Sequence, residues 1–143
     1  MDKTWILVAD RVGARLFESL DAAFPPVEIA SFVNPAGHTP AGSRGDARPP
    51  RTMESMGGAR HAIEPHTTPM EKATREFARE LRDALEAGRL DHRFDHLMLI
   101  APPRFLGALR AELGKQLARC VTREIERDQL DMTVQEIAAQ LRG

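Results

Sequence analysis

Four residues that could contact a ligand lie close together in the middle of the chain. Gly57 and Gly58 are adjacent, and Arg60 and His61 follow after one alanine. Because glycine accepts positive φ and leaves its amide exposed, Gly57 and Gly58 could let the backbone approach a ligand or RNA closely. Arg60 and His61 would then lie beside that ligand. The alternative is an ordinary flexible turn that binds nothing.

A predicted helix directly after this segment carries regularly spaced basic residues. They are separated by three, four and three positions and are Lys72, Arg75, Arg79 and Arg82. This spacing places them on roughly one side of a helix, where they could follow the phosphate backbone of RNA. Acidic residues within pairing distance are Glu76, Asp83 and Glu86. A solvated face of ion pairs is therefore the alternative interpretation.

Two further polar residues follow predicted strands. Asp10 ends the first strand, where open α/β sheets place their ligand crevices, so it is a candidate for a polar crevice. An Asx turn that closes a hairpin, with Arg11 as a pairing partner, is the alternative. Arg104 follows the most apolar strand at the start of a helix, where a phosphate or carboxylate would meet both the guanidinium and helix amides. Otherwise Arg104 is a surface arginine whose stem covers Phe105.

The histidines do not predict a metal site. His61, Glu64 and His66 could meet around a divalent ion, but a proline between them disrupts regular spacing, so a solvated polar loop is the better interpretation. His92 and His96 are four residues apart, at a position where a strand begins, so the pair is expected to split between turn and strand. The sequence predicts no catalytic residue, no metal and no cofactor.

Composition limits the classes of partner. The 143 residues include 20 basic and 21 acidic side chains, a net charge of −1, so any surface for nucleic acid must be local. Cys120 is the only cysteine, which excludes an internal disulfide and fits a reducing compartment. The apolar run at residues 5–9 is too short for a signal peptide, and no transmembrane span is predicted. The expected location is the cytoplasm.

The elements that must position these residues follow a mixed α/β order. The strands are predicted at residues 5–9, 14–20, about 27–33, 96–101 and 120–125, with Cys120 in the core, and the helices at 68–88, from 102 and from 133. Thr68 and Glu71 predict a capping box at the start of helix 68–88, and Gly88 is expected to end it. Strand 96–101 is expected to be central and parallel, because it is apolar almost throughout. Residues 34–69 are rich in proline and glycine and predict a long mobile loop. The prediction is a single domain, residues 1–143, with a single-layer mixed sheet flanked by helices.

Four segments in this order resemble the bacterial host attachment protein family, which is named for a role in attachment to host cells. They are residues 4–11, 14–18, 57–65 and 101–107. The resemblance implies a ribonuclease-H-like fold, similar to the middle domain of archaeal and eukaryotic peptide-release factors and of Pelota. In the release factors a Gly-Gly-Gln loop precedes a basic helix and enters the peptidyl-transferase centre. This chain has Gly57 and Gly58 before its basic helix but Ala59 at the position of the glutamine.

The resemblance and the residues together predict a non-catalytic binding factor inside the cell. RNA or the translation apparatus would be its partner, and attachment to host cells would be an indirect outcome. One alternative is an enzyme, a peptidyl-tRNA hydrolase or nuclease, which needs convergent carboxylates near Asp10 or a replacement for the missing amide. A second alternative is an exported adhesin that acts directly at the host surface. The oligomeric state stays open.

Overall fold

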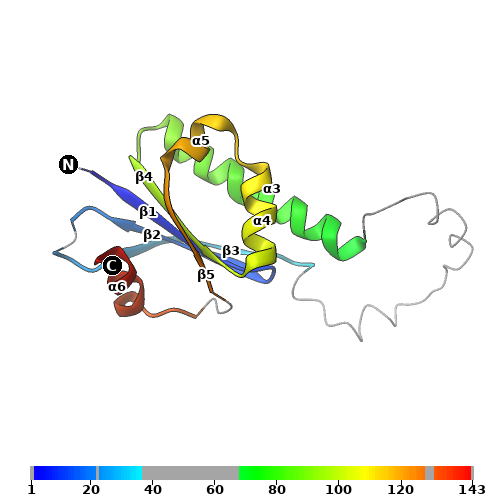
Figure 1. Ribbon diagram of the computed structural model, residues 1–143, viewed down its shortest axis with the longest axis horizontal. Coiled ribbons are helices and arrows are strands. Elements are labelled where there is room, and N and C mark those ends of the chain that lie inside the picture. The colour runs from blue at the N-terminus through cyan, green and yellow to red at the C-terminus, as the bar shows by residue number, and fades with distance from the viewer. Residues whose placement is uncertain (1, 22, 37–67, 128–130, 143) are drawn as a thin grey trace, which may run out of the picture.

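The sheet has five strands and is flanked by helices. The computed structural model describes residues 2–21, 23–36, 68–127 and 131–142 (Figure 1). The strands are β1 (Thr4–Ala9), β2 (Gly13–Ser19), β3 (Val27–Val33), β4 (His96–Ala101) and β5 (Val121–Glu126). The helices of the described ranges are α3 (Pro69–Leu90), α4 (Pro103–Glu112), α5 (Lys115–Cys120) and α6 (Val134–Arg142).

The strand order is β3-β2-β1-β4-β5. The pairs β1–β2 and β2–β3 are antiparallel, whereas β1–β4 and β4–β5 are parallel. The predicted mixed sheet with an antiparallel first half and a parallel second half is therefore confirmed. So is the prediction for residues 96–101, because β4 is an interior strand with a parallel neighbour on each side.

Helices cover both faces of the sheet. Side chains alternate along β1 and β4, so that Leu7 and Leu99 face α3 and α4, while Val8 and Ile100 face α6. In Figure 1, α3 and α4 lie side by side over one face and α6 lies on the opposite side. Burial on both faces explains why β1 and β4 are continuously apolar rather than alternating.

Helix α3 begins where the sequence predicts and ends later. The predicted capping box is present, since Thr68 Oγ1 accepts from the Glu71 N–H at 3.0 Å and Glu71 Oε1 accepts from the Thr68 N–H at 3.1 Å. The prediction that Gly88 ends the helix is wrong, because α3 continues to Leu90. Gly88 is buried and faces the ring of Trp5. The glycine is used for close packing rather than for termination.

A histidine in the left-handed backbone region closes α3. His92 has φ 55°, its N–H donates to Arg89 O at 3.0 Å, and the N–H of Arg93 donates to Gly88 O at 2.9 Å. These bonds satisfy the last carbonyls of the helix, but only glycine adopts such a φ without steric cost. We expect His92→Gly to raise the free energy of unfolding by roughly 0.5–1 kcal/mol in urea denaturation. Asp91→Gly, at φ −92°, is the control and should lower it.

The second half of the chain contains one helix that the sequence does not predict. Residues 120–125 were expected to form a strand with Cys120 in the core, but α5 occupies residues 115–120 and β5 starts at Val121. Cys120 is the last residue of α5 and is only partly buried. Gly114 is the N-cap of α5, so it separates two short helices.

The predicted loop at 34–69 needs correction at both ends. Asn34 is 5% exposed and is fixed by backbone and side-chain hydrogen bonds, so it belongs to the packed end of β3. Pro69 is the first residue of α3. The remainder of the predicted loop falls largely on residues 37–67, which lie outside the described residues, and its mobility stays a prediction.

Candidate ligand-binding edge of the sheet

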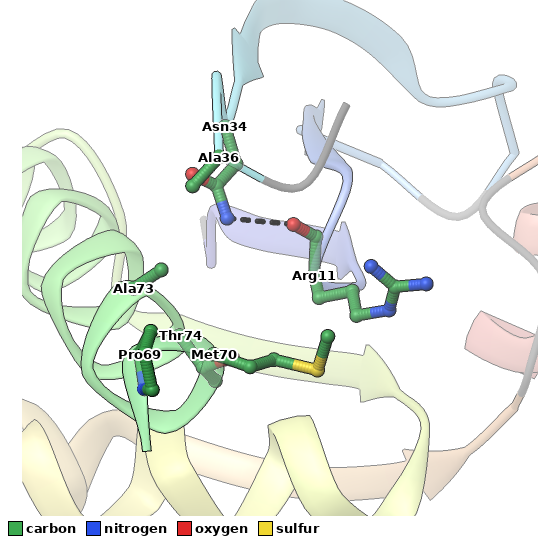
Figure 2. Close-up of a pocket in the computed structure, with 7 residues that line it drawn as sticks. All are labelled: Arg11, Asn34, Ala36, Pro69, Met70, Ala73 and Thr74. Carbon is green, nitrogen blue, oxygen red and sulfur yellow. Dashed lines mark hydrogen bonds between the residues drawn. The ribbon is translucent and has the colours of Figure 1, made fainter. Parts of the chain in front are cut away.

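Three segments meet at the edge of the sheet where β1 and β4 end. The two strands are parallel, with Val8 opposite Ile100, so the turn after β1 and the start of α4 lie at the same edge. The first turn of α3 also reaches this edge, because Arg11, Pro69 and Met70 line one cavity (Figure 2). Carboxyl ends of parallel strands are the usual place for ligand crevices in open sheets.

Asp10 forms an Asx turn, which was the alternative to its role in a polar crevice. Its Oδ1 accepts hydrogen bonds from the N–H groups of Val12 at 2.7 Å and Gly13 at 3.1 Å, and its own N–H donates to Gly13 O at 2.9 Å. This is an Asx turn that closes the β1–β2 hairpin. The predicted pairing of Arg11 with Asp10 is wrong, because the Arg11 guanidinium has no hydrogen bond or ion pair within the described ranges.

Arg104 lies on the first turn of α4 and is exposed. The N-cap of this helix is Pro102, whose side chain makes no capping hydrogen bond. The guanidinium of Arg104 has no hydrogen-bonding or ion-pair partner in the part of the chain that the structure describes. The neighbouring Phe105 packs against Phe77, with ring centroids 5.9 Å apart, so the start of α4 lies against the first half of α3.

The four basic residues predicted on α3 fall into two pairs with different surroundings. Lys72 and Arg75 are exposed and have no ion-pair partner among the described residues. Arg79 Nε lies 3.0 Å from Glu112 Oε1, and Arg82 Nη1 donates to Glu112 O at 3.2 Å. The second pair therefore joins α3 to the end of α4, whereas the first pair is free to contact a ligand.

The acidic residues of α3 only partly follow the predicted ion-pair face. Asp83 pairs with Arg82 at 2.8 Å, which agrees with that interpretation. Glu86 pairs instead with Arg89 at 2.5 Å, and the hydrogen bond from Arg89 lowers the pKa of the Glu86 carboxyl. Glu76 has no ion pair within the described ranges and lines a cavity next to β3. Arg79 and Arg82 of α3 thus lie toward α4, whereas Glu76 and Glu80 lie toward the end of β3.

Two adjoining cavities separate the end of β3 from the first half of α3. The first has a volume of about 60 Å³ and is lined by Arg11, Asn34, Ala36, Pro69, Met70, Ala73 and Thr74 (Figure 2). The second has a volume of about 260 Å³ and is lined by Asn34, Pro35, Ala36, Ala73, Glu76, Phe77 and Glu80. Asn34, Ala36 and Ala73 contribute to both. The sequence did not single out Asn34, although its position directly after the third strand is the same signal that singled out Asp10.

The remaining predicted site residues cannot be placed. Gly57, Gly58, Arg60 and His61 lie outside the described residues, as does Ala59. Within the described ranges, no group of three His, Cys, Asp or Glu side chains is arranged to hold a metal ion. The same ranges contain no helix both long and apolar enough to cross a membrane.

The fold and the site together define a mixed α/β protein in which cations near one edge of the sheet have no partner among the described residues. The family model described as "Protein required for attachment to host cells" matches residues 5–141. The chain therefore belongs to this family, and the resemblance of residues 4–11, 14–18, 57–65 and 101–107 is confirmed at that level. A search of curated proteins finds no match to the chain.

Proposed function

We propose that this host-attachment-family protein is a cytoplasmic, non-catalytic factor that binds RNA within the translation apparatus. Attachment to host cells is then an indirect outcome of that binding. The basic contact surface consists of Lys72 and Arg75 on α3 and Arg104 on α4. The segment with Gly57, Gly58, Arg60 and His61 supplies a second contact that precedes α3 in the chain.

One observation carries the proposal: the cations near the start of α3 and α4 are unpaired, while those farther along α3 are paired. Arg79 and Arg82 contact Glu112 and Asp83, so their charge is largely neutralised within the fold. Lys72, Arg75 and Arg104 are exposed and have no such partner in the described part of the chain. Exposed unpaired cations are what phosphate contacts require, because each one releases counterions when it meets the RNA backbone.

The expected resemblance to the middle domain of release factors supports ribosomal RNA as the partner. The same order of parts, a Gly-Gly segment and then a basic helix, supports contact with ribosomal RNA by analogy. Ala59 replaces the glutamine, so the segment has no amide that would position water at an ester. The carboxylate of Asp10 is engaged in a turn. Both observations favour binding over hydrolysis.

Co-sedimentation with ribosomes tests the proposal directly. The purified protein should pellet with ribosomes at about 50 mM salt and return to the supernatant at several hundred mM salt, because phosphate contacts weaken steeply as salt rises. Lys72→Glu combined with Arg75→Glu should abolish pelleting while leaving the thermal transition unchanged, since both side chains are exposed. Failure of the native protein to pellet at low salt would contradict the proposal.

Two measurements separate the rival functions. Release of peptide from peptidyl-tRNA by the purified protein, abolished by His61→Ala, would favour a hydrolase. Recovery of the protein at the cell surface after fractionation would favour an exported adhesin. The proposal expects neither result.

A further inference from the structure

The second cavity, between the end of β3 and α3, has a lining of mixed character. Ala36, Ala73 and Phe77 give it apolar walls, and Glu76 and Glu80 place two carboxylates at its side. Apolar walls with a few placed polar groups are typical of ligand sites. They also match a long basic side chain, whose aliphatic stem prefers apolar contact while its charged head seeks carboxylates.

Asn34 has a buried acceptor atom that finds no donor in the described part of the chain. Its side chain donates from Nδ2 to Arg11 O at 2.7 Å, and it is 5% exposed. Figure 2 shows the amide nitrogen pointing to Arg11, with the amide oxygen on the other side of the group. Oδ1 accepts no hydrogen bond within the described residues, although Asn34 lines both cavities. A buried acceptor without a donor is costly, so a donor brought by a ligand would be favoured.

Two exposed carboxylates lie beside this acceptor and attract a cation. Glu76 and Glu80 are four residues apart on α3, so they lie on the same side of the helix and repel each other. Neither forms an ion pair within the ranges that the structure describes. Among the described residues no basic residue of α3 forms an ion pair with either carboxylate, since Arg79, Arg82 and Arg89 pair with Glu112, Asp83 and Glu86.

We propose that this cavity binds the side chain of an arginine or lysine presented by a partner protein. The charged head pairs with Glu76 and Glu80, a donor reaches Asn34 Oδ1, and the stem packs against Ala73 and Phe77. A divalent metal fits less well, because calcium requires six to eight oxygen ligands and the apolar walls supply none. Lys72 of the proposed RNA surface lies one helical turn before Glu76 but is not part of the lining of this cavity, so the site does not depend on RNA binding.

A short peptide tests the proposal on the full chain. Acetyl-Gly-Arg-Gly-amide should bind with a dissociation constant on the order of 1 mM, as expected for one anchored side chain, and should shift the amide resonances of Asn34 and residues 73–80 in NMR titration. The same peptide with citrulline in place of arginine has the same shape without the charge. It should bind at least about tenfold more weakly.

Matched variants distinguish binding at this site from general electrostatic attraction between the peptide and the protein. Glu76→Gln combined with Glu80→Gln should weaken binding at least about tenfold. Glu126→Gln combined with Asp131→Asn changes the net charge equally at exposed positions elsewhere and should leave binding unchanged. Ala73→Leu should block the cavity without changing charge. Equal loss in both charge variants, equal binding of the citrulline peptide, or tighter binding of Mg²⁺ than of the peptide at these residues would each overturn the proposal.

Discussion

Gly88→Ala is expected to lower the free energy of unfolding by about 1–3 kcal/mol, the usual cost of overpacking a core. A Cβ atom at Gly88 would lie 2.4 Å from Trp5 Cη2 and 2.5 Å from Cζ3. The Trp5 ring has little room to move away. It packs on Phe94 with centroids 4.7 Å apart, and its Nε1 donates to Glu18 Oε2 at 3.2 Å. Urea denaturation monitored by far-ultraviolet circular dichroism measures the change.

Gly107→Ala is the matched control. Gly107 lies inside α4, and nothing lies within 4 Å of a Cβ atom added there. The same substitution should therefore stabilise the fold by roughly 0.5–1 kcal/mol through helix propensity alone. The cost at Gly88 should shrink when Trp5 is replaced by phenylalanine, because the clash involves the outer ring of the indole. Equal effects at Gly88 and Gly107 would show that the Trp5 contact does not constrain the helix.

Trp5 and Gly88 show which parts of the fold could be predicted from sequence. Trp5 belongs to an apolar run that predicts a buried strand, and Thr68 with Glu71 predicts the start of α3, because both signals are local. The role of Gly88 could not be predicted in this way. Its close approach to Trp5 is a contact between residues far apart in sequence, and a glycine near a helix end more often marks a terminus.

The candidate site was predictable to a similar degree. The strand pattern of the sequence predicts that Asp10 and Arg104 follow strands. Both residues lie at the edge of the sheet that this pattern predicts. Which cations of α3 stay unpaired depends on Glu112, a residue of α4 whose distance from Arg79 no spacing rule gives. Asn34 was assigned to a loop because proline and glycine follow it, and the hydrogen bond to Arg11 that holds it is again nonlocal.

Neutralising the unpaired cations should have the largest effect on binding. Replacing Lys72, Arg75 and Arg104 together by glutamine is expected to weaken binding of single-stranded RNA about 100-fold at low salt, irrespective of sequence. Each removed phosphate contact lowers the dependence of log K on log salt by about 0.7, so the slope should fall by about 2. Fluorescence anisotropy with a labelled oligonucleotide over a series of salt concentrations measures both quantities.

The paired cations of α3 provide the comparison that decides how binding is achieved. Replacing Arg79, Arg82 and Arg89 by glutamine removes the same charge, all of it from α3, but these side chains already contact Glu112, Asp83 and Glu86. Their loss should reduce stability modestly, because ion pairs near the surface contribute little, and should leave the salt slope close to that of the native protein. Equal loss of affinity in both triple variants would mean that RNA responds to the overall charge of α3 rather than to the unpaired residues. An unchanged affinity in the first variant would remove α3 and α4 from the binding surface and leave residues 57–61 as the remaining candidate.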